Sequence, residues 1–349
     1  MAIFFDAAVE PDDLTTFTRE VPVPRELTLL SEFPRRDLDT NTVDFAEIVR
    51  TNRTAKYRAY DGRIHVSERD VGSEKRVKMI PLSSSLNMGE YERLQLEFAR
   101  LGGTNQQALS RAIYNEGEQL TREVQNRLEL AWGDLLADGK LTISENGYGG
   151  ETDYGLAALG NLVTPSVQWT AANLATMTPL NDLQTWSDAY RLTNGGVRPE
   201  RAKTSLTRLR VLQRAKEVID AVYGATQGRT RVSVQQLNDL LRDEGLPVFD
   251  EAYDSSFDVD GVTTRTITDD KVSLMPANLA DLGYTAWGVT ATALELVNSS
   301  QSDLSFEDAP GIVGVVEKVG PPYREFTYVD AVAMPILANA RRLMVADVA

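Results

Sequence analysis

The chain has 349 residues, enough for two or three domains, and its 42% hydrophobic and 25% charged residues allow a buried core and argue against disorder. Its net charge of -15 argues against general nucleic-acid binding, which usually requires a basic face. The absence of cysteine excludes disulfides, thiolate zinc sites and cysteine nucleophiles, and it is compatible with a reducing cytoplasm.

Residues 1–42 show little hydrophobic periodicity. Pro11, Pro22, Pro24 and Pro34 favour extended backbone and oppose regular helix. Such a segment is either a frayed terminus or an arm that lies along another surface. Its start lacks the basic region of a signal peptide, and no apolar run in the chain is long enough to cross a bilayer. We therefore expect a soluble, intracellular protein.

A long two-stranded excursion follows. Residues 43–48 and 54–59 have the alternation of a strand, Asp61-Gly62 is a hairpin signal, and a second strand returns over 77–82. Between residues 53 and 78 there are eight basic and four acidic side chains, a local charge of +4 in an acidic chain. The basic residues are Arg53, Lys56, Arg58, Arg63, Arg69, Lys75, Arg76 and Lys78. We expect this basic excursion to contact the acidic body of a neighbouring copy; the alternative is a solvated loop.

The longest predicted element is an amphipathic helix over 104–137, preceded by a short helix over 88–101. Its apolar positions recur at steps of three, four or seven: Leu109, Ile113, Leu120, Val124, Leu128, Ala131 and Leu135. A helix of this span is about 50 Å long. Because the repeat is short and Gly117 interrupts it, we interpret the helix as a strut with other elements laid across it, and not as a coiled coil.

The second half of the chain is predicted to be mixed. A glycine-rich hairpin covers 141–156, and residues 180–298 have the pattern of a separate α+β unit. Within it, residues 206–222 form a single amphipathic helix, and Ser233 with Gln236 makes a capping box. Strands are expected at 271–275, 326–337 and 342–348.

Catalytic signatures are absent or incomplete. The one histidine, His65, has no nucleophile elbow around it, and a zinc site would need an all-carboxylate shell. Gly139-Lys140 lacks the Ser or Thr of a phosphate loop. Asp258 and Asp260 imitate part of a calcium loop without its closing glutamate, and we interpret them as turn residues. The sequence therefore predicts no enzyme and no catalytic, cofactor-binding or metal-binding residue.

The order of these parts, together with two local stretches, resembles the lambda-type major capsid protein of tailed phages, the major capsid protein E family. One stretch is Asp-Gly-Lys-Leu-Thr-Ile-Ser at 138–144 followed by Glu-Thr-Asp-Tyr-Gly at 151–155. The other begins with Tyr-Arg-Glu-Phe-Thr at 323–327, continues with Met-Pro-Ile-Leu at 334–337 and ends at 343–348.

The resemblance implies an α+β capsid fold of the Hong Kong 97 type. The implied parts are an N-arm at 1–42, an extended E-loop at 43–85, a peripheral domain at 86–179 with the spine helix 104–137, an axial domain at 180–298, and a return of the chain with C-terminal strands at 299–349. Long arms let each copy contact several neighbours, so modest contacts add up. We expect the basic excursion to lie over one neighbour and residues 1–42 to lace beneath another. A truncation of 56–78 should then leave a folded monomer that forms no shells.

The implied function is a major capsid protein that assembles as hexamers and pentamers into an icosahedral head around double-stranded DNA, without sequence-specific DNA binding. The resemblance implies portal and scaffolding proteins as partners, an optional decoration protein, no membrane, and a place in the virion after assembly in the host cytoplasm. One alternative shares the fold and is an encapsulin-like compartment. Another, from a different class, is a carboxylate-based hydrolase or sugar-binding protein, which would be a compact monomer.

Overall fold

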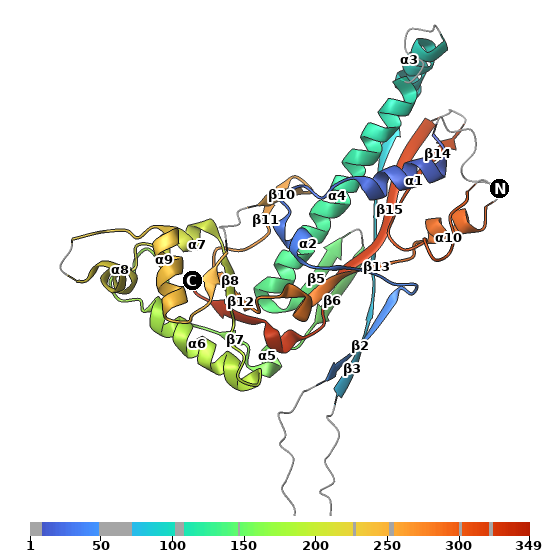
Figure 1. Cartoon of the computed structure of the whole chain (residues 1–349). Helices are drawn as coiled ribbons and strands as arrows, with labels where there is room; N and C mark the ends of the chain where they lie inside the picture. The colour runs from blue at the N-terminus through green and yellow to red at the C-terminus, as the bar shows by residue number, and fades with distance from the viewer. Residues whose placement is uncertain are drawn as a thin grey trace, which may run out of the picture.

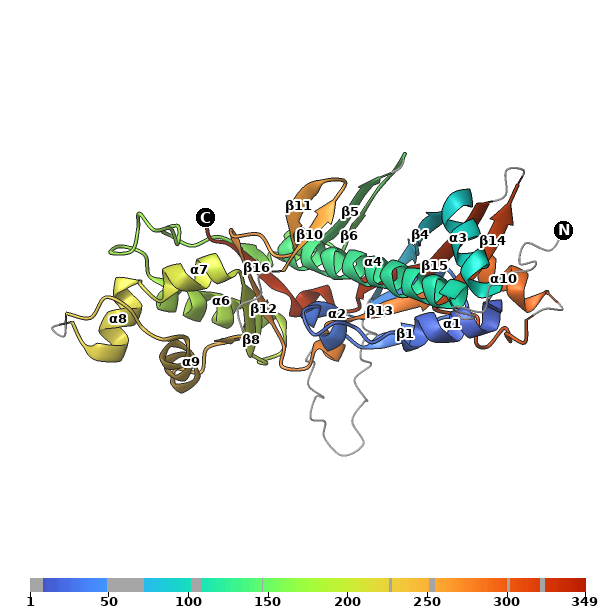
Figure 2. The same cartoon turned by 90° about the horizontal axis from the view of Figure 1, so that it is seen from above.

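The computed structural model describes residues 9–48, 72–101, 108–145, 147–225, 228–250, 255–299, 302–320 and 324–349, and all structural statements concern these residues. They form an elongated body along one long helix, as Figures 1 and 2 show from two directions. Two five-stranded sheets and three two-stranded ribbons make up the β structure of this part of the chain.

The first sheet is built around β15 (Arg324–Leu337), a strand of 14 residues. β14 (Ile312–Val319) and β13 (Gly283–Gly288) pair antiparallel with successive parts of one edge of β15. β4 (Pro81–Met88) pairs antiparallel with the other edge, and β1 (Arg35–Asp37) adds in parallel to β13. Segments from both ends of the chain therefore meet in one sheet.

The long helix α4 (Ala108–Asp138) lies across this sheet, and α3 (Glu90–Leu101) precedes it at the same end of the body (Figure 1). α4 covers most of the predicted range. Its predicted apolar stripe is buried, with Ala131 partly so; the fully buried members are Leu109, Ile113, Leu120, Val124, Leu128 and Leu135. Several of them pack against Val329 and Ala331 of β15, so the strut interpretation holds within this chain.

The expectation that residues 1–42 lack regular helix is wrong. α1 (Pro11–Glu20) and α2 (Thr28–Glu32) are helical, and Pro11 stands in the first turn of α1, where its missing N–H is no loss. The apolar side chains of this segment are buried: Val9, Leu14, Leu27, Leu29, Leu30 and Phe33. Residues 9–42 are therefore packed on their own chain, which contradicts a frayed terminus.

α1 packs closely between α4 and β14 because each of these two elements has a glycine at the contact. Cβ atoms added at Gly117 and Gly314 would lie 3.1 Å and 3.0 Å from the Leu14 side chain. Thr15 is buried and exchanges hydrogen bonds with Gly314, its hydroxyl donating to the carbonyl at 3.1 Å and accepting from the amide at 3.3 Å. Gly117 thus serves a close helix contact and does not break α4.

α2 is capped by a side chain from α4. The backbone N–H groups of Leu29 and Leu30 donate to the two carboxylate oxygens of Glu129, at 2.9 Å and 2.6 Å. Glu129 is completely buried, and a carboxylate at a helix N-terminus also favours the helix dipole. Next to it, the Phe33 ring stacks on Trp132 with ring centroids 3.6 Å apart.

The second sheet has the order β7 (Leu162–Val163), β16 (Met344–Asp347), β12 (Lys271–Met275), β8 (Arg201–Thr204) and β9 (Val248–Phe249). β12 is antiparallel to both of its neighbours, whereas the outer pairs are parallel. This sheet contributes to a separate apolar core, at the end of the body opposite to α3 (Figure 2).

Four helices cover this second core: α6 (Pro179–Thr193), α7 (Leu206–Leu212), α8 (Lys216–Tyr223) and α9 (Val234–Asp243). The capping box of Ser233 and Gln236 at α9 is confirmed. The single helix predicted over 206–222 is wrong, because it is broken into α7 and α8. Tertiary hydrogen bonds end α7 early: Val232 N–H donates to the Gln213 carbonyl, and Lys216 N–H donates to the Leu174 carbonyl.

The three ribbons are β2 (Thr42–Ile48) with β3 (Gly72–Lys78), β5 (Lys140–Glu145) with β6 (Tyr148–Asp153), and β10 (Ser256–Val259) with β11 (Val262–Arg265). The second ribbon confirms the glycine-rich hairpin predicted over 141–156. The remaining elements are α5 (Leu156–Leu159), η1 (Leu279–Asp281), α10 (Ala291–Val297) and η2 (Ala340–Arg342). None of the helices in the described part of the chain combines the length and apolarity of a membrane span.

Strand pairing divides the chain differently from the expected ranges 180–298 and 43–85. β13 lies inside the first range, yet it pairs with β15 in the first sheet, and the C-terminal β16 joins the second sheet. β4 begins inside the second range and also pairs with β15. These pairings join residues far apart in sequence, which hydrophobic patterning alone does not reveal.

Candidate assembly surfaces

The β2–β3 ribbon leaves the body at one side and points away from it (Figure 1). Its base is anchored because the opposed residues Val43 and Val77 are both buried in the core beside Met79. Along the ribbon the strands stay in register from Thr42 opposite Lys78 to Ile48 opposite Gly72. The described part of the excursion is therefore a projecting limb and does not fold back into the subunit.

Three of the eight predicted contact residues lie on this ribbon: Lys75, Arg76 and Lys78, all on β3. Arg76 and Lys78 are exposed and share one face, since side chains two positions apart in a strand point the same way. Arg53, Lys56, Arg58, Arg63 and Arg69 lie outside the described residues, as does His65. The ribbon also carries Asp44, Glu47 and Glu74, so the positive charge belongs to the longer segment: residues 42–78 have nine basic and six acidic side chains, a net charge of +3. We call residues 42–78, which include the β2–β3 ribbon, the basic arm.

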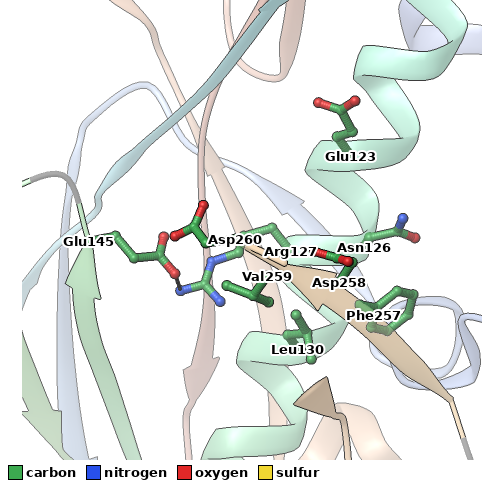
Figure 3. A pocket seen from close by; sticks show the side chains of 9 residues that line it. All are labelled: Glu123, Asn126, Arg127, Leu130, Glu145, Phe257, Asp258, Val259 and Asp260. Atoms are coloured by element: carbon green, nitrogen blue, oxygen red, sulfur yellow. Dashed lines mark ion pairs between the residues drawn. The ribbon is translucent and has the colours of Figure 1, made fainter. Parts of the chain in front are cut away.

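A groove of about 450 Å³ lies on a different part of the body, between α4 and the β5–β6 and β10–β11 ribbons. Figure 3 shows the side chains that line it. Its apolar part consists of Leu130 from α4 with Phe257 and Val259 from β10. We call it the acidic groove, because its charged side chains are four carboxylates and one guanidinium: Glu123, Glu145, Asp258, Asp260 and Arg127.

Arg127 neutralises only one of those carboxylates directly, through an ion pair of 2.8 Å with Glu145 (Figure 3). Glu123, Asp258 and Asp260 are exposed, so their charges face solvent at the mouth of the groove. A groove with an apolar floor and an excess of negative charge at its rim suits an extended basic segment with apolar side chains.

The groove continues along α4 into a second cavity of about 340 Å³, which shares Arg127, Leu130 and Glu145 with it. Burial raises the pKa of Asp134 in this cavity, while the Thr142 N–H donates to its carboxylate at 2.8 Å and opposes that shift. The walls stand close because α4 carries a glycine here. A Cβ added at Gly133 would lie 2.0 Å from the Thr266 carbonyl oxygen, at the base of the β10–β11 ribbon.

The acidic groove was not predicted from the sequence. Asp258 and Asp260 were interpreted as turn residues, and this is confirmed: the Gly261 N–H donates to Asp258 at 2.7 Å, and Asp260 has a φ of 53°. Their part in the groove depends on Glu123 and Glu145, which come from other elements. The sequence shows that these residues are acidic, but not that they lie together.

The described residues offer no group of three His, Asp or Glu side chains arranged to hold a metal ion. The adjacent pair Asp269 and Asp270 serves structure: Asp269 forms an ion pair of 2.6 Å with Arg265, and Asp270 one of 3.1 Å with Lys271. Burial raises the pKa of both carboxyl groups, but the net shift is downward, because Ser205 donates a hydrogen bond to Asp269 and Thr268 donates one to Asp270, and the two ion pairs add to this effect. Carboxylates held in the ionised form in this way are poor general acids at neutral pH.

Comparison with known proteins identifies the family. A family model described as phage major capsid protein E matches residues 10–304, most of the chain. The chain belongs to the phage major capsid protein E family. No curated protein sequence matches it. The family consists of structural capsid proteins and not of enzymes, in agreement with the absence of a catalytic signature.

Solved structures agree with the family. A chain described as a prophage capsid protein from E. coli CFT073 is 14% identical, matches with a TM-score of 0.59, and the match covers 99% of this chain and 100% of that chain. A phage-related protein from Bordetella bronchiseptica RB50 gives 13% identity and a TM-score of 0.49, with 98% of both chains covered. The capsid of Myoviridae phage XM1 gives 13% identity and a TM-score of 0.47, with 92% and 91% covered. The match to the prophage capsid chain, with its TM-score of 0.59, and the family model together give the predicted phage capsid fold of the Hong Kong 97 type, and members of this family assemble into shells.

Proposed function

We propose that this major capsid protein assembles as hexamers and pentamers into an icosahedral head that encloses double-stranded DNA. The observation that carries the proposal is a pair of features on one chain: an arm that projects through the β2–β3 ribbon and has a net charge of +3 over residues 42–78, and an acidic groove elsewhere on the body. A chain that presents two different complementary surfaces forms head-to-tail contacts, and such contacts close into rings when the rotation between copies permits.

The basic arm of one copy contacts the acidic groove of the next. In its own subunit the β2–β3 ribbon of the arm points away from the β10–β11 ribbon that walls the groove (Figure 1). Arg76 and Lys78 bring positive charge to the contact, and Glu123, Asp258 and Asp260 bring negative charge. Exposed charges at such a rim steer association, and the attraction between them weakens as salt screens it.

The net charge of -15 also suits a container for DNA. An acidic protein repels a polyanion, so a genome can enter and leave without adhering to the wall. Portal, scaffolding and decoration proteins are the expected further partners, and the virion is the expected location after assembly in the host cytoplasm.

Removal of the end of the arm tests its role. Residues 49–71 are replaced by Asn-Gly, so that β2 and β3, which are paired at Ile48 and Gly72, close through a two-residue turn. We expect a folded protein, checked by circular dichroism and its urea midpoint, that no longer forms particles in electron microscopy. Normal particles from this variant would contradict the role of the arm.

Charge reversal tests the pairing itself. Arg76→Glu with Lys78→Glu reverses the arm, and Glu123→Lys with Asp258→Lys reverses the groove. Each pair alone should weaken assembly, and the combination of all four should restore it, because opposite charges meet again. A matched control, Asp243→Lys with Glu244→Lys, changes the charge equally at exposed positions of the other core and should not restore assembly of the arm variant. Restoration by the control, or none by the groove variant, would rule out this contact.

A further inference from the structure

Helix α3 presents apolar side chains to solvent on one face. Tyr91, Leu94, Phe98 and Leu101 are 76%, 45%, 63% and 73% exposed. At 100° per residue these four positions fall within about 80° of the helix surface, so they form a single stripe. Isolated exposed apolar residues are normal on a protein surface, but a contiguous stripe of four indicates a partner.

The opposite side of α3 is already occupied by its own subunit. Leu96 packs against the core formed by Leu109 and Ile113 of α4. Arg93 forms an ion pair of 3.3 Å with Glu325 of β15, whose side chain is 1% exposed. These contacts fix the rotation of α3 about its axis, so the stripe is held outward and cannot turn into the subunit core.

The spacing of the stripe is that of a helix–helix seam. Steps of three, four and three residues from 91 to 101 reproduce the a and d positions of one and a half heptads. α3 also lies at one extremity of the body, past the end of β15 and away from the second core (Figure 1).

We propose that α3 of one subunit packs, through the seam formed by Tyr91, Leu94, Phe98 and Leu101, against α3 of another copy of this chain. The inference rests on the proposed shell function, because every subunit of a self-assembling shell brings the same seam to its meeting points with others. A seam of one and a half heptads is too short to hold two free chains together. The contact therefore forms once the arm and groove have brought subunits together, and it adds to them through multivalency.

Disulfide trapping tests the seam directly, since the natural chain has no cysteine. Leu94→Cys places one thiol on the seam, and the matched control Glu92→Cys places one on the same helix, about 160° around its axis. Both positions are exposed. Each variant is assembled, checked for particles by electron microscopy, oxidised, and run on a non-reducing gel. Leu101→Cys is the second seam variant, used if Leu94→Cys assembles poorly.

We expect at least about fivefold more covalent dimer from the seam cysteine than from the control, because a disulfide needs Cα atoms within roughly 7 Å of each other. Intact particles in which the seam and control cysteines give equal dimer would overturn the inference while leaving the shell function standing. That result would mean that another protein, or nothing, covers the stripe. Absence of particles from the natural chain would instead contradict the proposed function and the seam together.

Discussion

Gly133 and Gly117 lie on the same helix, and Gly→Ala at each should have opposite effects on stability. Both substitutions gain about 1 kcal/mol of helix propensity in the middle of α4. At Gly117 the new Cβ meets only the end of the Leu14 side chain, at 3.1 Å, which can shift slightly. At Gly133 it meets the carbonyl oxygen of Thr266 at 2.0 Å, and the backbone there has to move by about 1.4 Å to reach an ordinary contact of 3.4 Å.

Overpacking of this kind costs about 1–3 kcal/mol, so Gly133→Ala should be less stable than Gly117→Ala by that amount. With a urea slope of roughly 3 kcal/mol per molar, the two midpoints should differ by roughly 0.3–1 M, measured by circular dichroism on unassembled protein. Gly133→Ala should also impair assembly, because Thr266 lies at the base of the β10–β11 wall of the acidic groove. Equal midpoints for the two variants would refute this account of how α4 and the wall approach each other.

Two further substitutions probe carboxylates of α4, the buried Glu129 and the half-buried Glu116. Glu129→Gln should lower the unfolding free energy by about 1–3 kcal/mol, because the amide cannot accept from both Leu29 and Leu30 as the carboxylate does. The exposed control Glu118→Gln should change the unfolding free energy by no more than about 0.5 kcal/mol. Urea midpoints measure both changes. Burial raises the pKa of Glu116 above the usual glutamate value, so the folded chain binds this proton more tightly than the unfolded chain does. The resulting stability is complete below the unfolded pKa and is lost as pH rises through the raised folded pKa. Glu116→Gln should therefore match the natural chain in acid and exceed it in urea midpoint at neutral pH, whereas a constant difference at all pH values would contradict the shift.

Local patterns predicted the parts of the fold that local physics determines. The stripe of α4 is buried because its spacing matches one helix face, and the Ser233 box caps α9 through neighbours three residues apart. The same reasoning failed for α1, where Pro11 was interpreted as a helix breaker although it starts the helix, and where Leu14 is buried by residues distant in sequence, such as Ile113 and Val316. The prediction of one helix over 206–222 failed at Gln213, because a tertiary hydrogen bond from Val232 to the Gln213 carbonyl ends α7.

The candidate surfaces show the same division. The charge of the basic arm is a local property, and the sequence therefore predicted it from residues such as Arg76 and Lys78. The acidic groove needs Glu123, Glu145 and Asp258 from three elements that only the fold brings together. The sequence predicted a short helix over 88–101 but no seam on it, because only the structure shows that Leu96 packs inward while Leu94 and Phe98 are exposed.

The central claim is that copies of this chain build a closed shell by contacting one another. Electron microscopy of the purified natural chain, concentrated at low salt, tests it most directly. The account predicts regular closed particles that dissociate into smaller units as rising salt screens the contact between arm and groove. A chain that stays a folded monomer at every concentration and salt would contradict it.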